Sequence, residues 1–172
     1  SAAFLSQDFV DANFAFYGTE LTGVPVNRER WKRGVSFVEA AMGEAVGKVY
    51  VERHFPSAAK EAMDELVANL IEAYRQSIEG LEWMTPATRE RALEKLAAFT
   101  PKVGFPEKWK DYSALEVDPA DLIGNVLRAN AWEHDRQLDK LGAPIDRDEW
   151  YMTPQTVNAY YNPLMNEIVF PA

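Results

Sequence analysis

The C-terminal residues of the chain include V-N-A-Y-Y at positions 157–161 and N-E-I-V-F-P-A at positions 166–172, two short runs of strand-forming residues. Between them, N-P-L-M at positions 162–165 is a polar, proline-marked turn, so the segment is predicted to be a β-hairpin. A two-stranded hairpin is marginally stable in water unless more strands or a helix cover it. Because the preceding sequence has helical patterns, we expect the rest of the sheet to lie outside these residues, in a larger protein.

Five helices are predicted upstream of the hairpin, from apolar residues spaced three and four positions apart. The third has the most regular apolar stripe, and between the fourth and fifth we expect an aromatic loop over 103–117. The expected helices are one closed by Gly18, one from the Asn27 N-cap to Pro56, one from the Ser57 N-cap to about Glu79, one from the Thr85 N-cap to Pro101 and one from Asp118 to Gly142. The expected fold class is therefore mainly α, a helical bundle-like domain followed by a C-terminal β-hairpin.

Length and composition are those of a globular protein with a substantial core: 172 residues, 47% hydrophobic and 26% charged. The net charge of −9 and the pI near 4.8 argue against binding to nucleic acid and to anionic membrane surfaces, which need clustered Lys and Arg. No apolar run is long enough to span a bilayer. The chain has no cysteine, which excludes disulfides, thiolate nucleophiles and cysteine-based zinc sites.

Side chains that could carry catalysis are scattered along the chain. A zinc peptidase needs two histidines one helical turn apart with a glutamate between them, as in H-E-x-x-H, because this spacing puts both imidazoles on one helix face and the glutamate beside the metal-bound water. Only His54 and His134 are present, far apart; His54 is expected at a helix C-terminus and His134 in the core. D-R-D-E at 146–149 lacks the glycine and the later glutamate of a calcium loop. No catalytic and no metal-binding residue is expected in this chain.

Several short motifs follow one another upstream of the hairpin: R-W-K-R-G-V at 30–35, M-G-E-A-V-G-K-V-Y-V at 42–51, L-E-W-M at 81–84, R-E-R-A-L-E-K-L at 89–96 and D-R-D-E-W at 146–150. Together with V-N-A-Y-Y and I-V-F-P-A, this ordered set resembles the M13 family of zinc metallopeptidases. The family includes neprilysin, endothelin-converting enzyme and bacterial oligopeptidases. The resemblance covers nearly the whole chain.

The resemblance implies that the chain is an interior segment of a zinc metalloendopeptidase that hydrolyses small peptides. Residues 1–150 would belong to a helical domain that roofs the cleft and filters substrates by size. Residues 151–172 would begin a thermolysin-like catalytic domain with a substrate-aligning hairpin. The resemblance also implies zinc in the whole enzyme, bound by an H-E-x-x-H motif beyond residue 172, with none bound by this chain. Its partners would be oligopeptide substrates and the rest of the catalytic domain, and the chain alone would be inactive.

Two residues of the hairpin are the candidate substrate-binding residues. An extended peptide can bind by adding a strand to an exposed sheet edge. Carried over from the family's N-A-[FY]-Y strand, the side-chain amide of Asn158 would hydrogen-bond the substrate backbone on the primed side of the cleaved bond. Ala159 would contribute main-chain groups, and its small side chain would leave room for the ligand. Without the resemblance, the residues alone favour a strand-end or turn role for Asn158.

Two other interpretations stay open at this point. The chain could be a non-catalytic helical interaction module whose hairpin edge recruits a partner, or an M13 homologue that has kept the fold and lost the zinc. The absence of cysteine indicates a bacterial member, since vertebrate members are extracellular and disulfide-bonded. The whole protein is then expected in the periplasm, secreted, or anchored outside the cell, although no membrane segment is expected in this chain.

Overall fold

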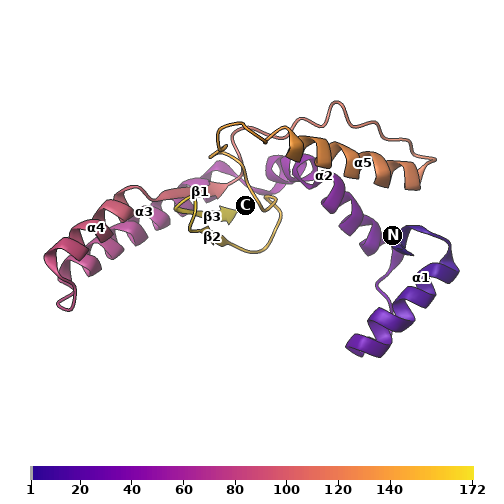
Figure 1. The fold of residues 1–172 in the computed structure, drawn as a ribbon, viewed down its shortest axis with the longest axis horizontal. Helices are drawn as coiled ribbons and strands as arrows, with labels where there is room; N and C mark the ends of the chain where they lie inside the picture. The colour runs from indigo at the N-terminus through magenta and orange to yellow at the C-terminus, as the bar shows by residue number, and fades with distance from the viewer. Residues whose placement is uncertain (1) are drawn as a thin grey trace. The chain divides into compact units, whose positions relative to one another are not determined.

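The computed structural model describes residues 2–172. It is mainly helical with one small sheet, which confirms the predicted fold class (Figure 1). Two compact units form: unit 1 is Ser1–Gly43 with Asp111–Ile145, and unit 2 is Glu44–Lys110 with Asp146–Ala172. The elements are the 3-10 helix η1 (Ala2–Phe4), α1 (Gln7–Asn13), the π-helix η2 (Phe14–Glu20), α2 (Arg30–His54), α3 (Ser57–Gly80), α4 (Pro86–Ala97), β1 (Thr100–Gly104), α5 (Leu122–Leu138), β2 (Tyr160–Asn162) and β3 (Glu167–Pro171).

The prediction that Gly18 closes the first helix is wrong. α1 passes into η2 at Phe14 without a break, and η2 runs to Glu20. Gly18 lies against the ring of Phe14: a Cβ built on the glycine would overlap Phe14 Cε2. The missing side chain therefore makes room for this ring within the wide turns of the π-helix, and the helix continues past the glycine.

α2 starts later than predicted and contains a break. Arg33 N donates to Glu29 O at 3.2 Å, and the helix begins at Arg30, so the predicted N-cap, Asn27, lies outside it. Met42 has φ −148° and ψ 39°, which are not helical values. The predicted second helix is therefore two helical segments, and the boundary between the compact units falls just after the break.

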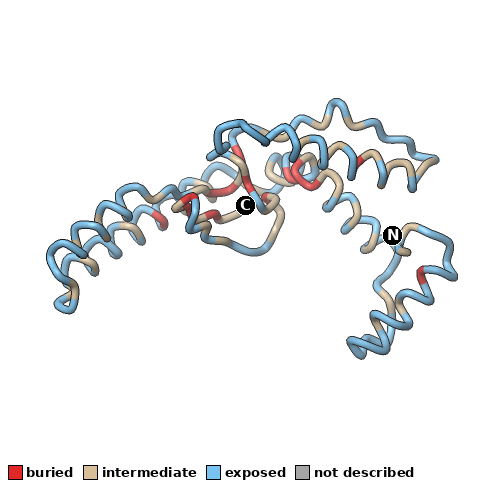
Figure 2. Tube along the Cα trace, in the orientation of Figure 1, coloured by how far each residue is buried: buried red, intermediate tan, exposed pale blue. Residues whose placement is uncertain are grey.

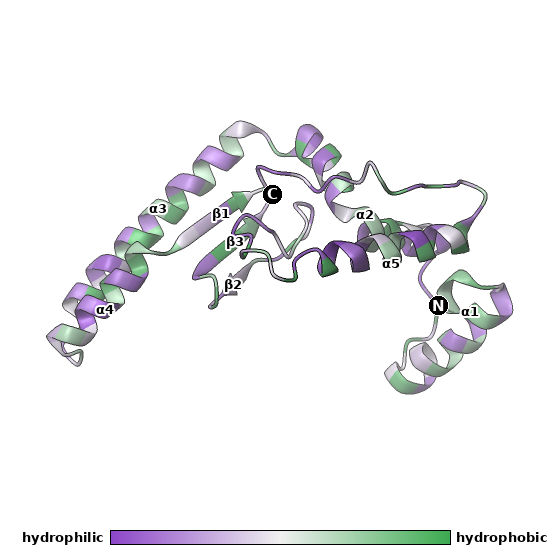
Figure 3. Ribbon diagram, turned by 45° about the horizontal axis from the view of Figure 1, so that its top comes forward, coloured by the Kyte–Doolittle hydropathy of each residue, from purple (hydrophilic) through white to green (hydrophobic). Residues whose placement is uncertain are grey.

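α3 and α4 pack side by side, and both carry hydrophobic residues interspersed with hydrophilic ones (Figures 1 and 3). α3 begins at Ser57 as predicted, although Pro56 takes the N-cap position expected for Ser57. The predicted N-cap of α4 is confirmed, because Thr85 Oγ1 accepts a hydrogen bond from Thr88 N at 3.2 Å. α4 ends before the predicted stop at Pro101, since the chain then enters β1.

The sheet has the strand order β1-β3-β2, with β3 in the centre. β2 and β3 are antiparallel, with Tyr160 opposite Val169, which confirms the predicted hairpin. Its first strand begins only at Tyr160, so the prediction that this strand starts at position 157 is wrong. β1 runs parallel to β3, with Thr100 opposite Glu167. The expectation that the chain holds no further strand for the hairpin is therefore wrong. Pro101 led to a predicted helix stop at this point, but proline is tolerated on an edge strand such as β1.

The most buried part of unit 2 surrounds the sheet (Figure 2). Val103 of β1 and Val169 of β3 are buried, together with Trp150 from the segment that leads to the hairpin. Gly104 ends β1 at φ 84°, and a Cβ there would lie 2.6 Å from Phe55 Cε1. Glycine is therefore required at this position, both for the left-handed backbone and for the close approach of the ring.

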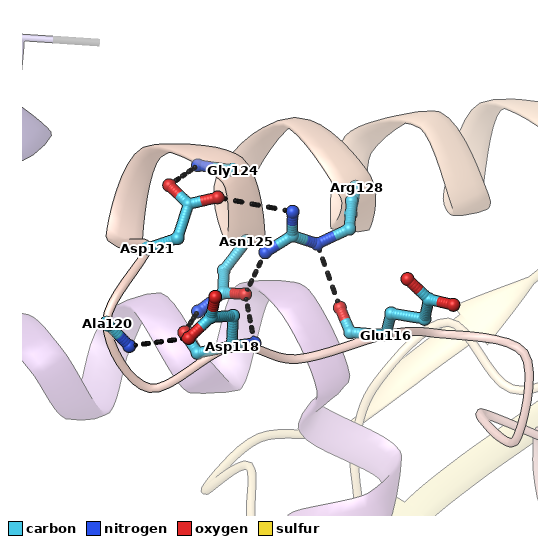
Figure 4. Close-up of polar contacts among 7 residues, drawn as sticks. All are labelled: Glu116, Asp118, Ala120, Asp121, Gly124, Asn125 and Arg128. Carbon is cyan, nitrogen blue, oxygen red and sulfur yellow. Dashed lines mark hydrogen bonds and ion pairs between the residues drawn. The ribbon is translucent and has the colours of Figure 1, made fainter.

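α5 begins after Asp121, later than the predicted start at Asp118 (Figure 4). Asp121 is the N-cap, since its Oδ1 accepts a hydrogen bond from Gly124 N at 2.8 Å. Asp118 is held outside the helix by Asn125: Asp118 N donates to Asn125 Oδ1 at 2.8 Å, and Asn125 Nδ2 donates to Asp118 O at 2.7 Å. This pair of bonds fixes the Asp118 backbone against the first turn of α5. α5 also ends before Gly142, at Leu138.

Candidate substrate-binding edge

β2 has one edge that no strand covers within residues 2–172 (Figure 1). β3 pairs with one side of β2, through Tyr160 opposite Val169 and Asn162 opposite Glu167. The other side carries backbone N–H and C=O groups that can pair with another chain. An edge of this kind can bind an extended peptide as an added strand.

The two predicted binding residues, Asn158 and Ala159, lie directly before β2, and both are exposed. Asn158 N donates to Thr156 O at 2.9 Å, and Asn158 Oδ1 accepts a hydrogen bond from Ala159 N at 2.8 Å. These bonds do not use the side-chain nitrogen of Asn158, which is the donor that a peptide carbonyl requires. The structure thus brings the two residues together at the start of the open edge. The same local bonds suit a turn residue, and the binding role stays a prediction.

Tyr160 anchors the first residue of β2 to the chain that precedes it. Its hydroxyl accepts a hydrogen bond from Tyr151 N at 3.1 Å, and the two rings meet edge to face with centroids 6.2 Å apart. Burial raises the pKa of the Tyr160 phenol; the hydrogen bond from Tyr151 opposes this shift, and the nearby Glu167 carboxylate adds to it. The neutral phenol is therefore favoured at this position.

A buried ion pair joins β1 to β3. Lys102 Nζ lies 2.7 Å from Glu167 Oε2, and the two side chains are only 9% and 2% exposed. Lys102 Nζ also donates to the backbone carbonyl of Glu149 at 3.1 Å. The second carboxylate oxygen, Glu167 Oε1, is buried and has no hydrogen-bond partner among residues 2–172. The pair places full charges beside the apolar centre of the sheet, where they stabilise each other only in a precise geometry.

The hairpin turn is tied to the elements around it. Asn166 adopts a left-handed backbone with φ 50°. Its Nδ2 donates to Lys95 O of α4 at 2.9 Å, and its carbonyl accepts a hydrogen bond from Thr100 N of β1 at 3.0 Å. Arg147 Nη1 donates to Met165 O at 3.3 Å. The turn is therefore fixed by α4, by β1 and by the segment that leads to β2.

One face of the hairpin borders an apolar cavity of about 440 Å³ within unit 2. Tyr161 and Ile168, which are opposite each other across β2 and β3, line it, and Phe99 stacks on Tyr161 with ring centroids 6.1 Å apart. Most of the other lining residues come from α3 and α4, among them Val67, Leu70, Ile71, Tyr74 and Leu96. The Tyr161 face of the hairpin is therefore apolar, whereas the Glu167 face carries the ion pair.

Neither histidine lies in a cluster that could act as a metal site. His134 is exposed, so the prediction of a core histidine is wrong; Leu127 and Leu138 of the same helix, α5, are exposed as well. No three His, Cys, Asp or Glu side chains within residues 2–172 are grouped so that they could hold a metal ion, and a zinc ion does not fit among them. Within the same residues, none of the helices combines the length and the apolar character that a membrane span requires.

A sequence model of the family described as Peptidase family M13 matches residues 1–106, which is more than half of the chain. The chain belongs to peptidase family M13. The resemblance inferred from the ordered motifs is thereby confirmed.

Individual relatives agree with this M13 assignment. Neprilysin-3 of Drosophila melanogaster is 34% identical over 175 residues, which are 98% of this chain and 22% of that protein. The neutral endopeptidase of Lactobacillus helveticus is 35% identical over 173 residues, 99% of this chain and 27% of that protein. The crystal structure of the Mycobacterium tuberculosis zinc metalloprotease Zmp1 in complex with an inhibitor matches with a TM-score of 0.92 and 63% identity, over 99% of this chain and 25% of that one. This M13 chain spans about a quarter of the length of these relatives.

The ion pair of this M13 chain could not be found by sequence reasoning alone. One signal was present in the strand E-I-V-F-P. Glu167 and Val169 are two residues apart and therefore lie on the same face, and a carboxylate on a buried face needs a cation. The cation could not be named, because Lys102 lies on β1 and that strand was not predicted.

Proposed function

We propose that this chain is part of an M13 zinc metalloendopeptidase that hydrolyses small peptides, and that it supplies the strand along which the peptide lies. The observation that carries this proposal is the open edge of β2, with the exposed Asn158 and Ala159 at its start. The names of the relatives, neprilysin, neutral endopeptidase and zinc metalloprotease, support a peptide-cleaving enzyme.

The part that this chain plays is binding and orientation. A peptide added to β2 pairs its main-chain groups with those of the strand and is held extended. The side-chain nitrogen of Asn158 donates to a peptide carbonyl, and the small side chain of Ala159 leaves space beside it. Because main-chain groups are the same in every peptide, this edge selects extended oligopeptides and leaves the choice of residue to side-chain pockets.

Zinc belongs to the whole enzyme in this proposal. The side chains of residues 2–172 do not fit a zinc ion, so its ligands lie in another part of the enzyme. The chain alone is then inactive, and its partners are the peptide substrate and the rest of the catalytic domain.

The proposal divides the chain after residue 150, and β1 (Thr100–Gly104) links the two parts because it pairs with β3. Residues 1–150 form part of the helical domain that roofs the cleft and admits oligopeptides while excluding folded proteins, and their mainly helical structure supports this. Residues 151–172 belong to the catalytic domain. A bacterial protein in the periplasm, secreted or anchored outside the cell is supported by the likeness to the Mycobacterium protein and by the absence of cysteine.

The test is Asn158→Ala in a complete peptidase that carries these residues. Loss of one neutral hydrogen bond should lower kcat/KM for a peptide by about 0.5–1.5 kcal/mol, roughly two- to thirteen-fold. Zinc content and thermal midpoint should stay the same. Asn69→Ala, at an exposed position of α3, is the matched control and should have no effect. Unchanged kinetics would show that Asn158 does not bind peptide, and loss of zinc together with activity would show that its role is structural.

A further inference from the structure

The buried pair of Lys102 and Glu167 connects three pieces of unit 2. Lys102 lies on β1 and Glu167 on β3, with 2.7 Å between Nζ and Oε2. The same ammonium group donates to the carbonyl of Glu149, in the segment that leads to β2, at 3.1 Å. One lysine therefore contacts both the central strand and the chain that enters the hairpin.

The place of this pair in the sheet makes it sensitive to strand register. Lys102 is opposite Val169, and Glu167 lies two residues before Val169 on the same face of β3. A slip of one residue would turn Glu167 to the other face, which borders the apolar cavity, and would leave Lys102 buried without its carboxylate. Because a buried charge without a partner is strongly unfavourable, slipped pairings are disfavoured.

The register of β3 also sets the position of the open edge. β2 is aligned on β3 through Tyr160 opposite Val169. Asn158 and Ala159 directly precede Tyr160, so a shift of β3 against β1 would carry both of them along the edge. Binding groups lose their effect when they are displaced by about 1 Å.

We propose that Lys102 and Glu167 are positioning residues for substrate binding: they fix the register that places Asn158 and Ala159 beside the peptide. This inference rests on the proposed function of the β2 edge. Neither side chain touches the peptide; both act through the alignment of β1, β3 and β2. The pair thus favours one register of β1 against β3 over the slipped ones, a role that buried polar contacts have in some other proteins.

The test uses a complete peptidase in which the pair is replaced as a unit. K102M/E167L exchanges the two charges for apolar side chains of similar size, a change that often leaves stability unaltered or raised. We expect the thermal midpoint to stay near the wild-type value while KM for a peptide rises several-fold and kcat changes less. K60M/D64L removes an exposed ion pair of α3, with 3.0 Å between the charged atoms, and should leave KM unchanged. A wild-type KM in K102M/E167L would overturn the inference.

A coupling measurement separates positioning from general stability. In the wild-type background, Asn158→Ala should raise KM. In K102M/E167L the same substitution should raise it much less, because a displaced Asn158 has already lost its contact with the peptide. Two effects that simply add would overturn the inference, since a purely stabilising pair would leave the contribution of Asn158 intact.

Glu167→Gln provides the test if K102M/E167L does not fold. It keeps the shape of the side chain and removes its charge, and it should raise KM several-fold; a wild-type KM in this variant would overturn the inference. The outcome is distinct from failure of the proposed function. If Asn158→Ala leaves KM unchanged, the edge does not bind peptide. If Asn158→Ala raises KM and the variants of Lys102 and Glu167 do not, the edge binds and the positioning role is wrong.

Discussion

β2 and β3 lie side by side in one sheet, yet the chain around them is buried to very different degrees. In β3, Val169 is 0% and Glu167 is 1% exposed, whereas Val157, just upstream of β2, is fully exposed. β3 has a paired strand on each side, and β2 has one open edge within residues 2–172. The difference teaches that one hairpin can combine a buried strand, paired on both sides, with an outer strand that keeps one edge unpaired among the described residues.

The largest effect is expected when this chain, which carries the proposed binding edge, is studied without the rest of the enzyme. The 172-residue chain by itself should cleave no peptide and should retain no stoichiometric zinc. A zinc site needs three or four convergent ligands, and no three such side chains come together within residues 2–172. Metal analysis after dialysis and a fluorogenic peptide assay with added zinc measure both. One equivalent of tightly held zinc, or turnover that a chelator stops, would contradict the proposed function.

The next largest effect is expected at the buried strand. Glu167→Ala leaves the ammonium group of Lys102 buried without its carboxylate, and should lower the free energy of unfolding by about 3–5 kcal/mol. Asp64→Ala removes the acid of an exposed pair and should cost about 0–1 kcal/mol. Urea denaturation of both variants measures the contrast. Equal losses would show that burial does not distinguish the two ion pairs.

A matched pair of valines tests the same contrast without charge. Val169→Ala empties space at a position that is 0% exposed and should cost roughly 2 kcal/mol of stability. Val157→Ala, at a fully exposed position, should change stability by less than about 0.5 kcal/mol. The same denaturation experiment measures both. A large loss at Val157 would mean that the segment before β2 is packed against other residues.

The smallest effect concerns pH. Burial raises the pKa of the Tyr160 phenol above its usual 10.0, so the folded state favours the neutral form more than the unfolded state does. The stability that this provides is present below pH 10 and is lost as the pH rises through the raised pKa. Tyr160→Phe should remove this part of the alkaline loss, measured as thermal midpoints between neutral and alkaline pH. Tyr17→Phe, at an exposed tyrosine, should keep it.

Features that depend on adjacent residues could be predicted from the sequence. The cap at Thr85 needs only a hydroxyl and an N–H three residues later, and the start of α3 at Ser57 follows directly from Pro56. The hairpin was predicted because two strand-like runs flank a turn that contains Pro163. In each case, a few neighbouring residues determine the local structure.

Features that depend on distant partners could not be predicted. β1 is a strand because β3 pairs with it, and Pro101 alone indicated the end of a helix. The break at Met42 lies at a residue type that does not disfavour helix, so Met42 itself gave no signal of the break. Asn158 and Ala159 were identified only through the family resemblance, because an exposed Asn-Ala step before a strand has no local pattern that distinguishes binding from a turn.

Among residues 2–172, β3 is the central strand of the sheet and also its last strand in chain order. Its parallel partner β1 precedes α5, and the segment Asp111–Ile145 of the other unit lies between them in sequence. The sheet therefore cannot close until this long insertion has been synthesised and its ends have met, and non-local pairings of this kind slow folding. During synthesis on the ribosome, the backbone groups of β1 stay unpaired until β3 has been made, and unpaired strands are prone to aggregation. We expect the folding of unit 2 to have a slow step, in which β3 pairs with β1.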